Sequence, residues 1–412
     1  MYIDRTENKL YAFLIFLIWP FLSVIIAFKE YRYSWAKNII WFFTAYFAYS
    51  KVDPPEYYTD AVGYRSSFIS FAKEGTFSDL LDSFIFGETA DFFEPILKYV
   101  ISRFTDNYQI YFMIIGLMYG YFYSRNLWML LDKVKTKLTF VSVFIFIIFS
   151  LIIPIWNLGG FRFYLASQVF IYGIFNFLIL KNKSSIFFLL FSPIIHFSFV
   201  LPVISFLIYK FIGNRTTIFF LFFLFSSLFA EIAQNNLKQS SEFLPKVYSE
   251  RVEGYTNEEY IESISERKLE ANWYLSFANN VIGYSSYLFI LLLYWKRKLF
   301  LYDKDLVSIF SFTLLFYGII NMISGTAGIV RFYDIIYLLS FSVMFLFIQY
   351  YDESKIKKYI YLTFPFLAIF IIVSIRKGFD NFGLSTIFGN PFIAMFLEEK
   401  YPLIDFIKAL IM

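Results

Sequence analysis

Residues 138–180 read LTFVSVFIFIIFSLIIPIWNLGGFRFYLASQVFIYGIFNFLIL. Two apolar runs, 138–155 and 163–180, flank a short polar turn, and neither run alternates apolar with polar residues as a barrel strand does. Only helices and closed barrels satisfy every backbone N–H and C=O group inside a bilayer, and a spanning helix needs about 20 mostly apolar residues. The stretch therefore predicts two membrane-spanning helices joined by a turn.

The composition extends this prediction to the whole chain of 412 residues. It is 59% hydrophobic and 24% aromatic, with a mean hydropathy of +0.60, which is more apolar surface than a soluble fold can bury. The absence of cysteine excludes disulfides, cysteine-ligated zinc and thiol chemistry. A net charge of +4 without a clustered basic stretch indicates no nucleic-acid partner. We therefore expect an all-α polytopic integral membrane protein with a single membrane domain over residues 1–412.

Other apolar runs predict further spans. They lie near residues 10–28, 35–51, 108–131, 216–233, 273–295, 305–324, 331–350 and 358–375. The stretch 184–212 contains Pro193, His196 and Pro202, so it is either one long kinked helix or a broken helical hairpin of two short passes. With the hairpin, the chain makes about 12 passes.

Charges between the spans favour the hairpin. With the amino terminus outside, the short segments rich in Lys and Arg then fall on the inner side, as the positive-inside rule requires. These segments are 29–37, 132–137, 181–183, 210–215, 296–305 and 351–358. A single kinked helix would instead put Lys296, Arg297 and Lys298 outside and the acidic segment 234–272 inside.

Three larger segments then lie outside. Residues 52–107 contain amphipathic helical patterns and are expected to lie along the membrane surface. Residues 234–272 form an acidic loop that reads as helical, and residues 376–412 form an outer carboxyl-terminal segment. The acidic residues of the loop are Glu242, Glu250, Glu253, Glu258, Glu259, Glu262, Glu266 and Glu270.

The chain lacks several familiar catalytic motifs. It has no phosphate-binding loop, no His-Glu-x-x-His metal site and no Gly-x-Ser-x-Gly elbow. With one histidine and no cysteine, a transition-metal site is not expected. The remaining candidates are polar residues at the outer ends of helices, where charge is costly and tends to be functional.

Two candidate stretches follow the second predicted span. Asp60, Tyr64 and Arg65 offer hydrogen bonds and an aromatic ring to a sugar, or they form an interfacial aromatic belt with Asp60 as a helix cap. Glu94 precedes Pro95 at a predicted helix start, where it either contacts substrate or only stabilises the helix dipole. Both interpretations stay open for each stretch.

The turn between the two helices of 138–180 is a third candidate. Asn157 and Arg162 flank a Gly159-Gly160 pair, which allows a close backbone approach. The planar guanidinium of Arg162 suits phosphate oxygens, and the sequence around it offers no acid to neutralise its charge. The alternative is an interfacial arginine that extends toward water.

His196 and a second glycine-arginine turn complete the set. His196 sits at the tip of the predicted hairpin, where irregular backbone normally lines a cavity, and imidazole can act as a base near neutral pH. A purely structural histidine is the alternative. Arg331 and Tyr333 lie in the second turn, where Arg331 could instead pair with Asp334 on a helix surface.

In this order, the motifs resemble those of the EpsG-like and Wzy polysaccharide polymerases. The matching residues are Asp60 with Tyr64, Glu94-Pro95, Asn157 with Arg162 and Leu165-Ala166, His196 with Ser198, Arg331, and Gly389-Asn390-Pro391-Phe392. The likeness covers nearly the whole chain, and its specificity lies in the order and topology of short motifs.

The resemblance implies a GT-C-like, multi-pass glycosyltransferase of the bacterial cytoplasmic membrane. Such an enzyme polymerises undecaprenyl-diphosphate-linked oligosaccharide repeat units at the outer face, for O-antigen, capsule or exopolysaccharide. The lipid-linked oligosaccharide would be donor and acceptor, a chain-length regulator a partner, and no metal or other cofactor would be needed. The implied catalytic residues are His196, Arg162, Glu94 and Asp60, and the implied substrate-binding residues are Arg331, Tyr64, Arg65, Asn157 and Tyr333.

Two other functions fit the same pattern. An O-antigen-ligase-like transferase would use the same donor with another acceptor. A flippase or transporter of the lipid-linked oligosaccharide also needs many helices, but transporters place their sites near the membrane midplane, and this chain has few charges there.

Overall fold

The computed structural model is helical throughout the part of the chain that it describes. The described residues are 6–52, 59–87, 89–135, 137–241, 243, 246–257, 263, 266, 272–351, 354–397 and 399–411. No strand occurs among them. Six helical runs are long and apolar enough to cross a membrane: Phe140–Leu178, Thr216–Asn236, Trp273–Trp295, Lys304–Met322, Gly328–Tyr350 and Lys355–Phe379. The expected class, an all-α membrane protein, is therefore confirmed.

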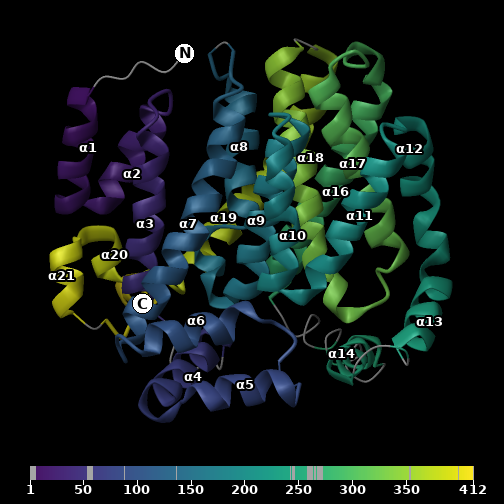
Figure 1. Cartoon of the computed structure of the whole chain (residues 1–412). Coiled ribbons are helices and arrows are strands. Elements are labelled where there is room, and N and C mark those ends of the chain that lie inside the picture. Colours follow the sequence, from purple (N-terminus) through teal and green to yellow (C-terminus); the bar gives the residue numbers. More distant parts are fainter. Residues whose placement is uncertain are drawn as a thin grey trace.

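A bundle of helices runs between two opposite faces of the molecule (Figure 1). Its members are α3 (Ala36–Ser50), α7 (Tyr108–Leu131), α8 (Phe140–Ile152), α9 (Phe161–Leu178), α12 (Thr216–Phe225), α16 (Trp273–Trp295), α17 (Lys304–Met322), α18 (Phe332–Tyr350) and α19 (Ser354–Phe379). The predicted helix pair at 138–180 is α8 and α9, joined by the 3₁₀ helix η1 (Ile155–Gly160). Most side chains of α17 and α18 are buried, so these two helices form the centre of the bundle.

Two glycines set the spacing between α3 and α7. A Cβ atom added to Gly116 would lie 2.5 Å from the Cβ of Ala48, and one added to Gly120 would lie 2.6 Å from the Cβ of Thr44. Both distances are shorter than van der Waals contact. Glycine is therefore required at both positions, because the α7 backbone lies directly against α3, as in other membrane helix pairs with small residues at the interface.

The first apolar run is not the single span predicted for 10–28. It forms two short helices, α1 (Thr6–Ile18) and α2 (Pro20–Lys29), which fold back on each other so that the start of α1 lies on the same face as Lys29 (Figure 1). The break falls at Trp19 because the ring of Pro20 disfavours helical backbone in the residue before it. The prediction of an amino terminus on the face opposite segment 29–37 is therefore wrong for the described start of the chain.

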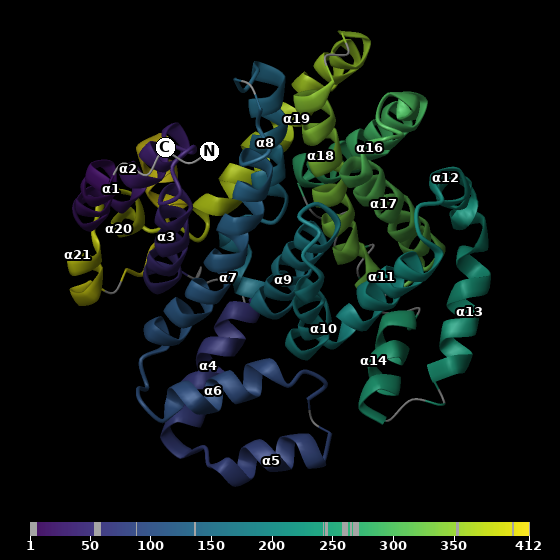
Figure 2. The same ribbon diagram turned by 45° about the horizontal axis from the view of Figure 1, so that its top comes forward.

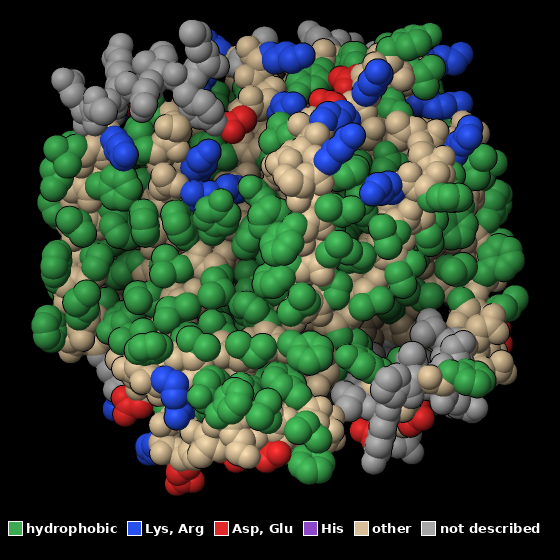
Figure 3. Space-filling view, in the orientation of Figure 1, with side chains coloured by type: hydrophobic (Ala, Val, Ile, Leu, Met, Phe, Trp, Pro, Cys, Tyr) green, Lys and Arg blue, Asp and Glu red, His purple; other side chains and the backbone are tan. Residues whose placement is uncertain are grey.

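The segments rich in Lys and Arg meet on one face, called here the basic face, at the top of Figure 3. Contacts between side chains or to backbone connect them. These contacts are Trp128 Nε1 to the Tyr31 carbonyl (3.0 Å), Lys133 and Lys181 Nζ to Asp305 (3.7 and 3.0 Å), Asn214 Nδ2 to Ser308 Oγ (3.3 Å), and Lys135 Nζ over the Tyr350 ring (4.3 Å). Segments 29–37, 132–137, 181–183, 210–215, 296–305 and 351–358 thus share this face, which is the grouping that the positive-inside argument predicted.

The opposite face carries a layer of shorter helices below the bundle (Figures 1 and 2). The segment 52–107 contributes α4 (Asp60–Glu74), α5 (Phe77–Ile85) and α6 (Phe93–Ser102). The acidic loop contributes α14 (Lys246–Thr256), whereas α13 (Ala230–Ser241) continues from α12 along the side of the bundle (Figures 1 and 2). Glu242, Glu258, Glu259, Glu262 and Glu270 of the predicted acidic set lie outside the described residues.

The stretch 184–212 is broken in the middle. α10 (Ile186–Ile195) descends from the basic face, and α11 (Val200–Ile212) returns to it, with His196 and the 3₁₀ turn η3 (Phe197–Phe199) between them. His196 has extended backbone angles (φ −147°, ψ 116°), so the helical hydrogen bonds stop there. The imidazole is thereby carried to the opposite face, next to the start of α6.

The carboxyl-terminal segment packs against the first three helices (Figures 1 and 2). It contains α20 (Leu384–Phe388), α21 (Pro391–Phe396) and α22 (Leu403–Ile411). The indole of Trp19 donates to the carbonyl of Ile387 (2.6 Å), and the Tyr46 hydroxyl donates to the carbonyl of Ser385 (2.6 Å). The amino-terminal helices and the carboxyl-terminal segment therefore pack together at the edge of the bundle formed by α3.

Candidate functional site

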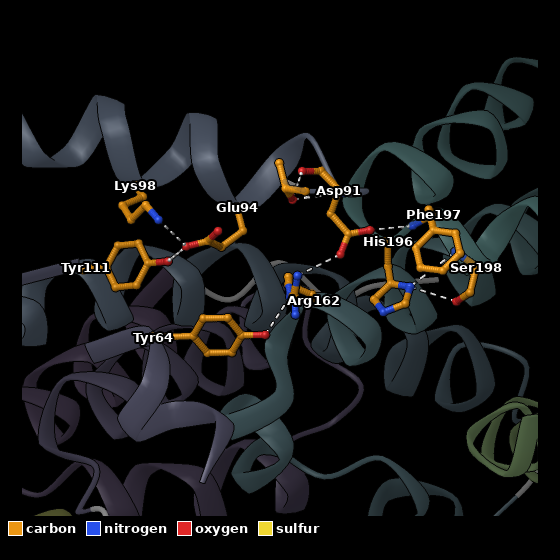
Figure 4. A network of polar contacts seen from close by, with 10 residues as sticks. Tyr64, Asp91, Glu94, Lys98, Tyr111, Arg162, His196, Phe197 and Ser198 are labelled. Atoms are coloured by element: carbon orange, nitrogen blue, oxygen red, sulfur yellow. Dashed lines mark hydrogen bonds and ion pairs between the residues drawn. The ribbon is translucent and has the colours of Figure 1, made fainter. Parts of the chain in front are cut away.

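Polar side chains from four separate stretches meet at the opposite face (Figure 4). They come from the amino-terminal part of α4, from the start of α6 and the residues just before it, from the start of α9, and from the tip of the α10–α11 hairpin. The predicted site residues Tyr64, Glu94, Arg162 and His196 all lie in this region. The resulting group of Tyr64, Asp91, Arg162 and His196 is called here the Arg162 cluster.

Arg162 is fully engaged with two partners. Its Nη1 donates to Asp91 Oδ2 at 3.0 Å, and its Nε donates to Tyr64 Oη at 2.6 Å. The expectation that no acid accounts for the Arg162 charge is therefore wrong, because Asp91 lies 71 positions earlier in the chain and reaches it through the fold. Only Nη2 of this guanidinium has no hydrogen bond to a described residue, and the side chain is 26% exposed.

Asp91 is the residue that connects the stretches. Its side chain is 2% exposed, and its second oxygen, Oδ1, accepts a hydrogen bond from the backbone N–H of Phe197 at 2.8 Å. One buried carboxylate thus holds the start of α9 and the tip of the hairpin to the layer of shorter helices. Such charge-assisted bonds are among the stronger ones in proteins.

Tyr64 contributes a phenol that stays protonated. Burial raises its pKa above the ordinary tyrosine value, although the neighbouring Arg162 acts in the opposite direction. Because the phenol oxygen already accepts from Arg162, its own O–H remains available as a donor. The guanidinium also lies over the edge of the ring, 5.3 Å from its centroid.

His196 is held by the hairpin turn itself. Its Nδ1 accepts the backbone N–H of Ser198 at 3.3 Å and lies 2.8 Å from Ser198 Oγ. A ring nitrogen that accepts a backbone N–H carries no proton, so in the neutral ring the proton resides on Nε2. In this tautomer His196 is a hydrogen-bond donor through Nε2.

Glu94 has protein partners that account for its burial. The Tyr111 hydroxyl donates to Glu94 Oε1 at 3.5 Å, and Lys98 Nζ lies 3.6 Å from the same oxygen, one turn further along α6. Glu94 also lies in the first turn of α6, where a negative charge is stabilised by the helix dipole. These contacts favour the structural interpretation of this residue.

Asp60 and Arg65 lie on α4 without joining the Arg162 cluster. Thr59, rather than Asp60, is the N-cap, and its hydroxyl accepts the N–H of Val62 at 3.4 Å. Asp60 is exposed and reaches the η1–α9 turn, where a Cβ atom on Gly160 would lie 3.8 Å from Asp60 Oδ2. The Arg65 guanidinium stacks over the Tyr108 ring at 3.9 Å.

Three other predicted residues line a cavity next to the cluster. Asn157, Arg331 and Tyr333 face a space of about 340 Å³ between η1, α9, α16, α18 and α19. We call this space the polar cavity. Its further polar lining includes Tyr164, Asp334 and Lys377. The alternative for Arg331, an ion pair with Asp334, is not among the contacts of the described residues, although Arg331 acts on Asp334 electrostatically.

Phe163 contacts a residue of each group. Its ring meets His196 edge to face, with centroids 5.6 Å apart, and the Arg331 guanidinium lies 5.9 Å from its centroid. The predicted residues thus form two neighbouring groups connected by one aromatic side chain.

Among the described residues, no group of three or more His, Asp or Glu side chains is arranged to hold a metal ion. No protein-family model, curated protein or solved structure matches this chain.

Three residues that the sequence did not single out belong to these groups. Asp91 stands three positions before Glu94, and only the fold shows that it pairs with Arg162. Asp334 could be noticed as an acid inside a predicted span, which is an uncommon position for a charge. Lys377 follows the predicted end of the last span and reads as an ordinary interfacial anchor, yet it lines the polar cavity.

Proposed function

We propose that this protein is a membrane glycosyltransferase that polymerises undecaprenyl-diphosphate-linked oligosaccharide repeat units at the outer face of the bacterial cytoplasmic membrane. The positive-inside rule assigns the basic face to the cytoplasm, so the Arg162 cluster and the polar cavity would open toward the periplasm or cell exterior. The observation that carries the proposal is the position of Arg331 beside the cavity, in contact with Phe163, whose ring also meets His196 of the Arg162 cluster.

Arg331 is the proposed contact for the donor diphosphate. It is exposed, and no described residue forms an ion pair with it, so its guanidinium is available for phosphate oxygens. Two nitrogens of Arg162 donate hydrogen bonds to protein side chains, so we assign this residue the role of holding the geometry of the site. Its Nη2 would donate to a ligand. Tyr64 and Asn157 would add hydrogen bonds from either side of the turn.

The reaction is a displacement at the anomeric carbon of the donor. The acceptor hydroxyl oxygen forms the new bond to this carbon, the bond from the carbon to the phosphate oxygen breaks, and its electron pair leaves with the diphosphate. Positively charged donors stabilise the charge that grows on this leaving group. A direct displacement of this kind inverts the anomeric carbon.

A base must take the acceptor proton, and the exposed carboxylate of Asp60 is the proposed one. Glu94 is bound by Tyr111 and Lys98, and His196 carries its proton on Nε2 in the tautomer that Ser198 favours. Replacing Asp60 with Asn should therefore abolish chain growth, while Glu94→Gln should act mainly through stability.

The polysaccharide pattern of a strain that lacks this protein tests the proposal. On a gel beside the parent and a complemented strain, the ladder should collapse to a single repeat unit on its carrier. Complementation with Arg331→Ala should give the same collapse with a normal amount of protein. Arg103→Ala is a matched control, since Arg103 lies at the end of α6 and contacts Tyr99 and the Gly75 carbonyl away from both groups.

Other polysaccharide patterns in the deletion strain would contradict the proposed polymerase. Loss of even the single unit, with lipid-linked oligosaccharide left on the cytoplasmic leaflet, would indicate a flippase. Full-length polymer accumulated on undecaprenyl diphosphate would indicate a ligase. An unchanged ladder would rule out a role in this pathway.

A further inference from the structure

We infer that the polar cavity binds the terminal sugar of the acceptor glycan, with Asp334 and Lys377 as its charged anchors. The role of this sugar as the acceptor rests on the proposed function, but the binding of a saccharide in the cavity can be measured independently.

The size of the cavity suits a short saccharide. Its volume of about 340 Å³ lies near the lower end of the range for small-molecule sites. A terminal sugar fits such a space, whereas a whole glycan chain would have to continue outside it. The walls come from seven separate elements, since Leu151 of α8 and Arg331 of η6 (Ala327–Arg331) add to the five elements named above, so the cavity is a property of the assembled bundle.

The charged side chains of the cavity form no hydrogen bond or ion pair with a described side chain. Arg331, Asp334 and Lys377 have no hydrogen bond or ion pair to another side chain in the described part of the chain, although Lys377 and Arg331 both act on Asp334 electrostatically. Asp334 and Lys377 lie within helical runs long enough to cross a membrane. A charge in that position is costly unless it meets water or a ligand, which is why such residues mark binding sites.

The rest of the lining matches the chemistry of a sugar. Tyr164, Tyr333 and Tyr337 supply ring faces for the C–H side of a pyranose and hydroxyls for its polar rim. Asn157 and Asn279 supply amides that both donate and accept. The Asp334 carboxylate can accept from two sugar hydroxyls, and Lys377 can donate to a third.

The location also fits an acceptor. Arg331, the proposed contact of the donor diphosphate, forms part of the cavity wall. A sugar held by Asp334 would therefore lie beside the anomeric carbon that it has to attack. Asp60 approaches the same turn, next to Gly160, from the side of α4.

Because the chain has no cysteine, single introduced thiols can report on occupancy. Asn279→Cys on α16 and Ser374→Cys on α19 place thiols in the cavity wall from two helices. Asn280→Cys is the matched control, since Asn280 is exposed but does not line the cavity. The full-length variants, purified in detergent, are labelled with a methanethiosulfonate reagent while the free repeat-unit oligosaccharide, released from the strain's own lipid-linked precursor, is titrated.

The expected result is protection at the cavity thiols alone. At an oligosaccharide concentration of about ten times its Kd, labelling at Asn279→Cys or Ser374→Cys should slow by about tenfold, and labelling at Asn280→Cys should not change. Adding Asp334→Asn or Lys377→Gln should raise the Kd by about tenfold, the usual cost of a lost hydrogen bond to a charged group, so that the same oligosaccharide concentration slows labelling only about twofold. Arg376→Gln should leave it unchanged, because Arg376 pairs with Asp380 and does not line the cavity.

The outcomes separate this inference from the proposed function. Protection at neither cavity thiol, or protection that survives both charge substitutions, overturns the sugar site even if the deletion strain loses its ladder. Protection that depends on Asp334 and Lys377, together with an unchanged ladder in the deletion strain, keeps the saccharide site and removes the polymerase.

Discussion

The Arg162 cluster and the polar cavity are neighbours that hold charge in opposite ways. In the cluster, both oxygens of the buried Asp91 carboxylate accept hydrogen bonds from the protein, and two nitrogens of Arg162 donate hydrogen bonds to protein side chains. In the cavity, Asp334 and Lys377 have no such bonds within the described residues. Charges that are paired inside a protein hold its geometry. A buried charge without a hydrogen bond or ion pair carries a desolvation penalty, which a bound ligand can reduce.

Loss of the pair at the centre of the cluster should have the largest effect on stability. Asp91→Ala leaves the Arg162 guanidinium and the Phe197 N–H without their partner, so the free energy of unfolding should fall by about 3 kcal/mol. Chemical denaturation of the purified protein in detergent measures this. Asp82→Ala, which removes an exposed carboxylate from α5, is the control, and an Asp91 variant as stable as the parent would contradict the central role of this pair.

Removal of both cavity charges should act in the other direction. The double substitution Asp334→Asn with Lys377→Met removes two opposite charges that make no hydrogen bond or ion pair within the described residues, and it should raise the free energy of unfolding by about 2 kcal/mol while chain growth is lost. The same denaturation assay and the polysaccharide gel measure the two effects. A loss of stability comparable to that of Asp91→Ala would show that the cavity charges support the fold.

Tyr64→Phe should have a smaller effect. It removes the acceptor for Arg162 Nε but keeps the ring and the pair with Asp91, so the free energy of unfolding should fall by about 1 kcal/mol. A double-mutant cycle with Asp91→Ala tells whether the two partners of Arg162 act together. Strict additivity would indicate two independent contacts rather than one cluster.

The ion pairs of the basic face should matter least. Asp305 bridges Lys133 and Lys181, but these side chains are from 25% to 51% exposed, so water already solvates them. Asp305→Asn should change the free energy of unfolding by no more than about 0.5 kcal/mol, and raised salt should reduce even that. An effect as large as that of Asp91→Ala would remove burial as the explanation for the difference between the two faces.

The sequence predicted the helical membrane class and most helices well, because long apolar runs leave few alternatives in a bilayer. It also grouped the basic segments on one face. It failed at α1 and α2, where the single residue Trp19 before Pro20 turns one apparent span into two short helices. Apolar content alone does not reveal such a break.

Site residues were harder to predict than helices. Arg162 was found from its glycine turn, but its partner Asp91 lies in another segment and meets it only in the folded chain. Lys377 was not proposed as a site residue, and the residues that line the cavity with it are distant in sequence. A helix can be predicted from a local stretch of sequence. The partners of a polar side chain come mainly from distant segments, which a single sequence does not identify.

The contacts between the amino-terminal helices and the carboxyl-terminal segment have a consequence for biogenesis. Trp19 and Tyr46 take their hydrogen-bond acceptors from Ile387 and Ser385, which the ribosome adds more than 300 residues later. The amino-terminal helices must therefore wait in the lipid, with part of their surface uncovered, until almost the entire chain has been translated. A protein truncated shortly after α19 would be left with an unfinished beginning as well as a missing end.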